Sequence, residues 1–183
     1  TQIAIGPGGP LALLDGRTGA NTGSLPVEGA YFTASFSADG RHLAAGGTVL
    51  ALLDADTLEF KASLPADGPV HSLCLADGGQ VFAASVGPQL VIHSLPLTNQ
   101  HTSPKGLGGV LACAWERPWL LTTSRAGVGK LVQAATGEVL LDLPDHATEV
   151  SAVDLTTDGR QAASGDVGGT VRLWRLDVRS DGQ

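Results

Sequence analysis

The sequence predicts an all-β protein with the β-propeller architecture, in which four-stranded antiparallel sheets called blades stack around a central axis. Three observations lead to this prediction. Four apolar segments of similar pattern recur about 40 residues apart. Asp-Gly turns, which favour tight hairpins, follow three of these segments. The 25 glycines and 10 prolines lie between short aliphatic runs, and no helical periodicity of useful length is present.

Each repeat contains short runs that predict strands. The first strands are expected at residues 31–36, 70–75, 110–115 and 150–155. Asp-Gly turns follow at Asp39, Asp77 and Asp158, because glycine accepts positive φ without a steric penalty. The second strands are expected at 43–46, 81–85, 120–124 and 161–165, and the third strands at 49–54, 90–93, 130–133 and 170–174. Weaker fourth runs lie at 58–64 and 139–143.

The N-terminal piece repeats the same frame. Ala4-Ile5-Gly6 and Leu13-Leu14-Asp15 match Ala44-Ala45-Gly46 and Leu52-Leu53-Asp54, which lie about 40 residues later. The chain is therefore expected to open in the second strand of a blade. The predicted organisation is a partial blade with the second to fourth strands at 1–29, blades at 30–68, 69–108 and 109–148, and a blade at 149–183 that lacks a clear last strand and ends in a tail.

A single blade cannot bury both of its faces, so neighbouring blades must stack, and roughly four to eight of them close a ring. Small residues on the second strands, such as Ala44, Ala83 and Ala162, suit the crowded interior of a ring. A β-sandwich also has short strands and polar turns, but it does not require a register held through four repeats. About four full blades and a partial one are predicted to form part of a larger ring of roughly seven blades. Other chain or a partner is expected to complete the ring, because exposed sheet edges favour aggregation.

Composition and charge narrow the class of function. Apolar residues make up 43% of the 183 residues and charged residues 16%, which is too apolar for a disordered chain. The net charge is −7, and the 11 cations are scattered singly, so neither nucleic acid nor an anionic membrane surface is an expected partner. No apolar run approaches the roughly 20 residues that span a bilayer, and the N-terminus does not have the pattern of a secretory signal.

The last repeat carries the clearest motif. His146-Ala147-Thr148-Glu149-Val150 is followed by Asp158-Gly159-Arg160, Ala163-Ser164-Gly165 and Gly169-Thr170-Val171-Arg172-Leu173-Trp174. Residues 146–174 closely resemble a WD40 repeat, and the rest of the chain resembles this family in degraded form. The resemblance implies a propeller in which His, Ser or Thr, Asp and Trp form a buried hydrogen-bonded tetrad that satisfies its polar groups.

Carried over to this chain, the tetrad pattern matches His146, Ser164 and Trp174. The acidic position falls on Gly168, and Asp166 lies nearby but out of register, so no complete tetrad is expected. In the other repeats, Leu53, His93 and a neighbour of Gln133 hold the tryptophan position. Ser85 and Ser124 resemble the hydroxyl member.

Cys74 and Cys113 are predicted to be small buried hydrophobic residues, because two cysteines are too few for a secreted disulfide scaffold. Free thiols indicate a reducing, cytoplasmic compartment. The chain begins with Thr1 and contains no methionine, so it is expected to be a segment or a processed chain.

No constellation points to chemistry. The five histidines (His42, His71, His93, His101 and His146) do not form a metal-binding motif. The glycine-rich stretches at 6–9 and 106–109 lack a P-loop Lys-Ser/Thr, and the carboxylates lie mostly in turns, where they hydrogen-bond local backbone. We therefore expect no catalytic residue, no metal and no cofactor.

Loops at the two ends of a propeller supply the candidate binding residues. At the end where each first strand begins, the exposed candidates are Asp67, Arg125, Asp145, Glu149 and Asp166. At the opposite end, Trp119 beside Arg117 has the character of an interface anchor, with packing against the neighbouring blade as the equal alternative.

The function predicted from the fold is a non-catalytic scaffold for protein–protein interactions within a multiprotein complex. Its partners would be other proteins or the remaining blades of the same polypeptide. Two alternatives stay open. One is a propeller enzyme or ligand-binding propeller with a site in the central channel, and the other is a permanent structural component of a cytoskeletal or ciliary-type complex.

Overall fold

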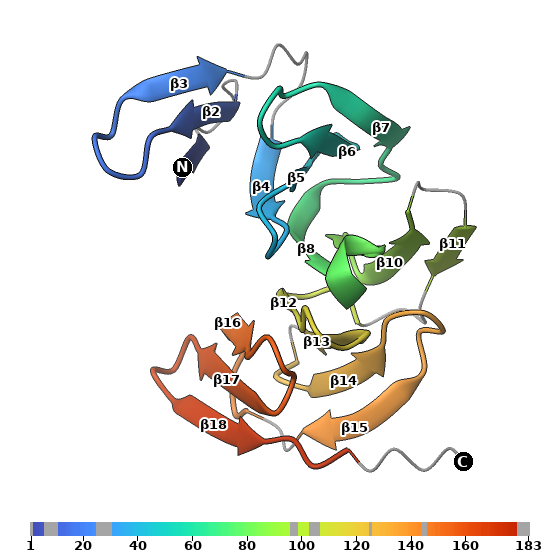
Figure 1. Cartoon of the computed structure of the whole chain (residues 1–183). Helices are drawn as coiled ribbons and strands as arrows, with labels where there is room; N and C mark the ends of the chain where they lie inside the picture. Colours follow the sequence, from blue (N-terminus) through green and yellow to red (C-terminus); the bar gives the residue numbers. More distant parts are fainter. Residues whose placement is uncertain are drawn as a thin grey trace.

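The residues that the structure describes form five antiparallel sheets, and we number them as blades 1 to 5 in chain order. The computed structural model describes residues 2–5, 11–24, 31–95, 99–102, 107–124, 126–143 and 146–178. The blades stack one beside the next in a curved row (Figure 1). This arrangement confirms the predicted all-β propeller architecture.

The strand bounds are as follows. Blade 1 contains β1 (Gln2–Ile5), β2 (Leu11–Leu14) and β3 (Asn21–Ser24). Blade 2 contains β4 (Tyr31–Phe36), β5 (His42–Gly47), β6 (Val49–Asp54) and β7 (Phe60–Pro65). Blade 3 contains β8 (Val70–Ala76), β9 (Val81–Val86), β10 (Gln89–Ser94) and β11 (Asn99–Thr102), with a short 3-10 turn, η1 (Asp77–Gly79), after β8. Blade 4 contains β12 (Leu111–Cys113), β13 (Trp119–Thr123), β14 (Gly129–Gln133) and β15 (Val139–Leu143). Blade 5 contains β16 (Val150–Leu155), β17 (Gln161–Asp166) and β18 (Val171–Arg175).

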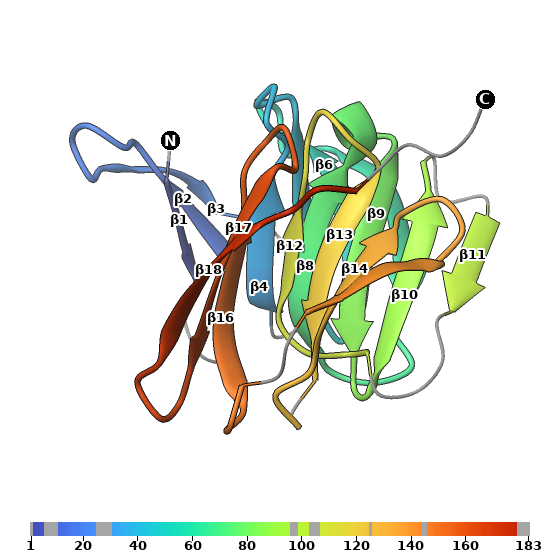
Figure 2. The ribbon, with the colours of Figure 1, turned by 90° about the horizontal axis from the view of Figure 1, so that it is seen from below.

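Within each blade, every strand pairs with the next one in sequence, so every blade is a simple meander. The first strands of blades 2 to 5 (β4, β8, β12 and β16) lie along the inner side of the curve, and β7, β11 and β15 lie on the outer side (Figure 1). Figure 2 shows the blades edge-on, with their strands running side by side. We call the end where the inner strands begin the entry end, and the other the turn end. The described residues contain no helix long and apolar enough to cross a bilayer.

Apolar side chains fill the space between successive blades. Leu11 and Leu13 of blade 1 cluster with Leu43 and Leu53 of blade 2, and Phe82 of blade 3 belongs to the next cluster. Two further clusters join blade 3 to blade 4 and blade 4 to blade 5. Because side chains alternate along a strand, blades 2, 3 and 4 bury both faces, which explains their nearly continuous apolar second and third strands.

The turns between first and second strands follow the predicted Asp-Gly chemistry. Asp39 accepts hydrogen bonds from the Ser37 hydroxyl at 2.6 Å and the Arg41 amide at 3.0 Å. Asp158 makes the same pair of contacts in blade 5, with Thr156 and Arg160. The following residues, Gly40 and Gly159, have φ of 73° and 68°, which only glycine adopts without strain. These carboxylates therefore shape turns.

The two cysteines form a disulfide, so the prediction of two separate thiols is wrong. Cys74 on β8 and Cys113 on β12 are bonded, with their Cα atoms 5.7 Å apart. The physical reason is the repeat itself. A separation of 39 residues places both cysteines on neighbouring inner strands, within the distance that a disulfide bridges. The prediction of a reducing, cytoplasmic compartment rested on free thiols, so the disulfide removes the argument for it.

Candidate functional site

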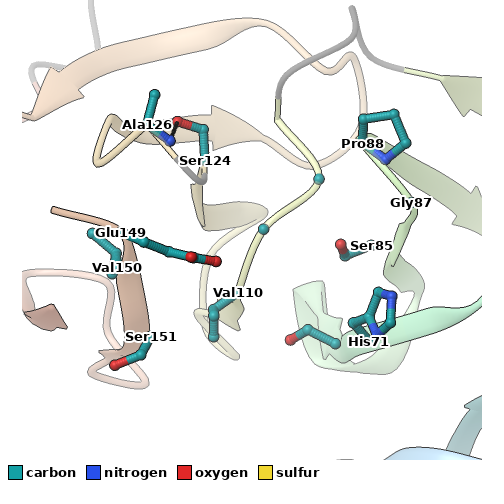
Figure 3. A pocket seen from close by; sticks show the side chains of 13 residues that line it. His71, Ser85, Gly87, Pro88, Val110, Ser124, Ala126, Glu149, Val150 and Ser151 are labelled. Carbon is teal, nitrogen blue, oxygen red and sulfur yellow. Dashed lines mark hydrogen bonds between the residues drawn. The ribbon is translucent and has the colours of Figure 1, made fainter. Parts of the chain in front are cut away.

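A pocket of about 960 Å³ opens at the entry end, where blades 3, 4 and 5 meet. Its walls come from the beginnings of β8 and β16, the segment before β12, the end of β9, and the chain that follows β9 and β13. Figure 3 shows His71, Ser85 and Pro88 on one side, Val110 in the middle, and Glu149, Val150 and Ser151 on the other side. The volume lies within the range of pockets that hold ligands in proteins.

Glycines allow the chain to cross between blades 3 and 4 at the base of this pocket. A Cβ at Gly109 would lie 2.1 Å from the Thr123 carbonyl oxygen, and one at Gly108 would lie 2.4 Å from the Gln89 nitrogen. Neither position accepts a side chain without moving backbone. From the sequence, this glycine-rich segment was explained by turn chemistry. In the structure, its glycines allow the backbones of two blades to approach closely.

Three amide donors at or near the rim of the pocket are used within the protein. The Gly108 amide donates to the Pro88 carbonyl at 3.2 Å, and the Gly87 amide donates to the Pro69 carbonyl at 3.3 Å. The Leu111 amide donates to the Ser72 hydroxyl oxygen at 3.0 Å.

The Ser85 hydroxyl is the unusual polar group in the pocket lining. The residue is 1% exposed, and its Oγ has no hydrogen-bond partner among the residues that the structure describes. Ser85 was predicted to resemble the tetrad hydroxyl, and the strand register contradicts that assignment. In blade 3, Val70 pairs with Val86, and in blade 5 the equivalent Val150 pairs with Asp166. Ser164 lies two residues before Asp166, so its place in blade 3 is held by Ala84, two residues before Val86. Ser85 is therefore one residue away from the tetrad position.

Ser124 does not hold the hydroxyl position of blade 4 either. In blade 4, Val132 pairs with Leu120, and in blade 5 the equivalent Trp174 pairs with Ala162. The hydroxyl residue Ser164 lies two residues after Ala162, so the equivalent position in blade 4 is Thr122. The Thr122 hydroxyl donates to the Leu107 carbonyl. Ser124 lies beyond the end of β13, where its Oγ accepts a hydrogen bond from the Ala126 amide at 3.2 Å.

The predicted binding residues at the entry end are only partly brought together. Glu149 is exposed and lines the pocket, and its carboxylate extends toward the middle of the pocket in Figure 3. Asp67 is exposed in the turn before β8 but does not line the pocket. Arg125 and Asp145 lie outside the described residues.

The fifth candidate, Asp166, is not a surface contact but the acidic member of a complete tetrad. The Trp174 Nε1–H donates to Ser164 Oγ at 2.9 Å, and the Ser164 hydroxyl lies 2.7 Å from His146 Nε2. The other ring nitrogen, His146 Nδ1, lies 2.9 Å from Asp166 Oδ2. The prediction of an incomplete tetrad with an exposed Asp166 is therefore wrong: Asp166 is only 8% exposed.

The geometry around Gly168 explains how Asp166 replaces the expected acid. A Cβ at Gly168 would lie 3.1 Å from Thr148 Oγ1 and 3.3 Å from Asp166 Oδ1, so the carboxylate lies in tight contact with the place that a side chain at position 168 would take. The Thr170 amide donates to the same oxygen at 2.8 Å. This backbone hydrogen bond, together with the one from His146, lowers the pKa of the Asp166 carboxyl although burial opposes the shift. The carboxylate stays ionised as an acceptor.

Blades 2 and 3 hold apolar or unpaired groups at the tetrad positions. The strand pairing places Leu53 of blade 2 and His93 of blade 3 at the tryptophan position. Leu53 pairs with Leu43 and His93 pairs with Phe82, in the same register in which Trp174 pairs with Ala162. His93 is 4% exposed, its Nδ1 lacks a partner among the described residues, and burial lowers the pKa of its imidazole. His93 is thus a neutral core residue.

At the turn end, Trp119 is not an exposed anchor, and the alternative of packing against the neighbouring blade is the one observed. Trp119 is 9% exposed, and a Cβ at Gly159 of blade 5 would lie 2.7 Å from its Cε3. The Arg117 guanidinium lies 4.7 Å from the centre of the Trp119 ring, a cation–π distance. Trp115 contacts Gly79 of blade 3 in the same way. The two tryptophans therefore connect blade 4 to both of its neighbours.

One face of blade 5 is uncovered although its residues match those of a buried face. Leu173 pairs with Ala163 and is 83% exposed, and Val171 on the same face is 72% exposed. The matching residues of blade 3 are Ile92, 1% exposed, and Leu90, fully buried, and they pack against blade 4. We call the surface formed by Val171 and Leu173, with Ala152, Ala163 and Gly165 beside them, the blade 5 face.

Potential metal ligands do not gather at any one place in the described part of the chain. No group of three or more His, Cys, Asp or Glu side chains that could hold a metal ion occurs among those residues.

Comparison with known proteins agrees with this geometry. The family description "WD domain, G-beta repeat" matches residues 137–175, which include the tetrad residues. The β-propeller domain of Cps50 (Swd1) from Myceliophteria thermophila is similar over 99% of this chain and 63% of its own, with 16% identity and a TM-score of 0.82. A chain of the mitotic checkpoint complex is similar over 92% of this chain and 56% of its own, with 18% identity and a TM-score of 0.77.

The chain thus spans less than two thirds of both solved chains, and the likeness to them concerns the fold. No curated protein sequence matches this chain closely.

Proposed function

Because the chain is a WD40-repeat protein, we propose that it is a non-catalytic scaffold that binds other proteins within a multiprotein assembly. WD40 propellers in general are interaction scaffolds, and one of the similar solved chains is part of the mitotic checkpoint complex. Fold similarity alone does not fix function, so the proposal depends on a surface of this molecule.

The blade 5 face is the observation that carries the proposal. Adjacent aliphatic side chains that are 72% and 83% exposed form an apolar patch of the kind that marks protein–protein contact. The equivalent residues of blade 3 pack against another blade. The chemistry of the blade 5 face therefore fits a further propeller blade, supplied by remaining blades of the same polypeptide or by a partner protein.

Thiol labelling in the native assembly tests this proposal. Val171→Cys is compared with a matched control, Val139→Cys, since Val139 on β15 is 41% exposed. Exposure in the structure alone makes position 171 the faster to react. If the blade 5 face is covered in the assembly, the order reverses and position 171 reacts more slowly than position 139.

Faster labelling at position 171 in the assembly contradicts the proposal. Full labelling of both variants after denaturation is the control for reagent access. Cross-linking from the thiol introduced at position 171, followed by mass spectrometry, then identifies the polypeptide that covers the face. This step separates a partner protein from remaining blades of the same chain.

A further inference from the structure

We propose that the outer edge of β18 binds an extended segment of a partner protein, which pairs with it as an antiparallel strand and carries an acidic residue between two aliphatic ones. This inference rests on the proposed function, because it assumes that the molecule binds proteins. It names the chemistry of one segment that binds at blade 5, beside the blade 5 face.

The hydrogen bonds of blade 5 show which backbone groups form this edge. The Thr170 carbonyl accepts a hydrogen bond at 3.0 Å from the last residue of β17, and the Leu176 amide donates one at 2.8 Å to the residue before β17. Because peptide groups alternate in direction along a strand, the N–H and C=O groups of Val171, Leu173 and Arg175 point away from β17. β18 is the outermost strand of blade 5 (Figure 1), and no strand of the described residues pairs with its outer side.

The equivalent edges of two other blades are covered, and they show what fits. In blade 4, β15 pairs with the outer side of β14, and the segment opposite the middle of β14 is Leu141-Asp142-Leu143. In blade 2, β7 pairs with β6 in the same way, and Ala62 and Leu64 are the two aliphatic residues at these places. A strand that pairs with β18 in the same register therefore places one aliphatic residue opposite Leu173 and one opposite Val171.

Arg172 determines the charge expected between those two aliphatic residues. Its counterpart in blade 4 is Lys130, whose ammonium forms an ion pair with Asp142 on the fourth strand. In blade 2 the counterpart is the uncharged Ala51, and the residue opposite is Ser63. Arg172 forms no ion pair with a carboxylate among the described residues. An acidic residue on the added strand would supply that pair across the strands.

The chain that follows β18 does not have the features of a fourth strand. In blades 1, 2 and 4 the chain reverses after the third strand through a threonine followed by Gly19, Leu58 or Gly137, all with positive φ. In blade 5 the threonine is replaced by Val178, which packs against the cluster between blades 4 and 5. Residues 179–183 contain no aliphatic side chain to place opposite β18. We therefore assign the added strand to a partner protein.

Binding of a synthetic peptide to the whole protein tests the inference. The probe is the end-blocked peptide with the sequence of residues 138–143, which form the fourth strand of blade 4. Hydrogen exchange followed by NMR should slow at the amides of Leu173 and Arg175 when the peptide is added. The Arg172 amide faces β17 and should not change. Unchanged exchange at Leu173 and Arg175 with millimolar peptide overturns the inference.

An exchange of charges tests the expected ion pair. Arg172→Glu should weaken binding of the peptide about fivefold, and the Asp142→Lys form of the peptide should recover the loss. Recovery distinguishes a direct contact from a general loss of stability. Arg160→Glu, which changes an exposed arginine in a turn of the same blade, is the matched control and should leave affinity unchanged. Equal affinity of the Arg172→Glu variant for both peptides contradicts the assigned pairing.

These results are separable from thiol labelling at position 171. Labelling reports on the side chains of the blade 5 face, whereas peptide binding reports on the backbone edge of β18. If position 171 is shielded in the assembly and β18 binds no peptide, this inference fails and the proposed function stands. If position 171 is open in the assembly, the proposed function fails by its own test.

Photo-cross-linking in the native assembly tests the source of the strand. The variant Arg175→p-benzoylphenylalanine places the cross-linker on the outer edge of β18, where Arg175 is exposed. We expect a cross-link to a different polypeptide, at a segment with an acidic residue between two aliphatic ones. A cross-link to the same polypeptide, to a second copy of it or to a segment without this pattern overturns the assignment, and so does the absence of any cross-link.

Discussion

Asp166 completes the tetrad from a position two residues before the one that the WD40 pattern assigns to the acid. The register of β16 and β17 places it opposite Val150, and the turn that follows brings the Thr170 amide to its carboxylate. Gly168 favours this arrangement because a Cβ there would lie in tight contact with the carboxylate, at 3.3 Å from Asp166 Oδ1. One network is thus built with its acid on the strand rather than in the turn.

An exchange of the acid between the two positions tests this interpretation. Asp166→Ala leaves His146 Nδ1 without its acceptor, and Gly168→Asp alone places a second carboxylate beside Asp166, so each should lower the melting temperature by roughly 5 °C. The double variant should melt well above Asp166→Ala, because position 168 then carries the acid. Additive losses measured by circular dichroism would rule out the interpretation.

At the scale of single elements, the turns between third and fourth strands differ at one position, where two blades have a glycine and blade 2 has a leucine. Gly19 and Gly137 adopt φ of 70° and 74° in blades 1 and 4, and Leu58 adopts φ of 61° at the same place in blade 2. Leu58 packs against the cluster between blades 1 and 2. Packing therefore compensates for a backbone conformation that leucine rarely adopts.

This interpretation predicts an inverted ranking of two variants. Leu58→Ala loses the packing and keeps the strain, whereas Leu58→Gly loses the packing and relieves the strain. Glycine should thus be more stable than alanine here by about 1 kcal/mol, the reverse of the usual order. Urea denaturation of both variants measures the difference, and a less stable glycine variant would show that position 58 carries no strain.

The aspartates in the turns also predict how stability depends on pH. Amide donors from Thr57 and Asp56 lower the pKa of Asp54 to about 2, and turn hydrogen bonds lower the pKa values of Asp15, Asp39 and Asp158. Folded-state values below the unfolded value mean that the unfolded chain binds more protons in this range. The stabilisation is complete above about pH 4 and is lost as the pH falls toward 2.

Chemical denaturation at a series of pH values measures this loss. The Asp54→Asn variant should be less stable than the parent at pH 7 and should lose less stability between about pH 4 and about pH 2. Parallel curves for the two proteins would mean that Asp54 does not contribute.

How far the sequence predicts the structure also differs between elements. Strand positions follow from the repeat because alternation and Asp-Gly turns are local signals. The cross-strand register is not local: it decides that Ala84 rather than Ser85 occupies the tetrad position, and that Asp166 turns inward. Trp119 lies in a turn by sequence, but Gly159 on the next blade leaves room for its ring.

At the scale of the whole molecule, the disulfide joins blade 3 to blade 4 through their inner strands. It closes a loop of 39 residues, so its removal should destabilise the fold by about 3 to 4 kcal/mol in the chain-entropy model. Denaturation of the Cys74→Ala/Cys113→Ala variant in non-reducing buffer measures this. The parent protein in dithiothreitol should show the same loss, and an unchanged unfolding free energy in both would contradict a stabilising cross-link.

The blade 5 face joins these observations to function. Four interfaces between blades bury the same kinds of side chain in the same register, and the fifth surface of that kind is open in the chain by itself. A molecule built this way presents an apolar face, and we propose that a further protein surface binds there.

The most direct test of the central proposal is a cryo-electron microscopy structure of the native assembly. A β-sheet packed against Val171 and Leu173, in the way that blade 4 packs against Leu90 and Ile92, is the predicted result. Solvent against both side chains in a well-resolved map would contradict the account.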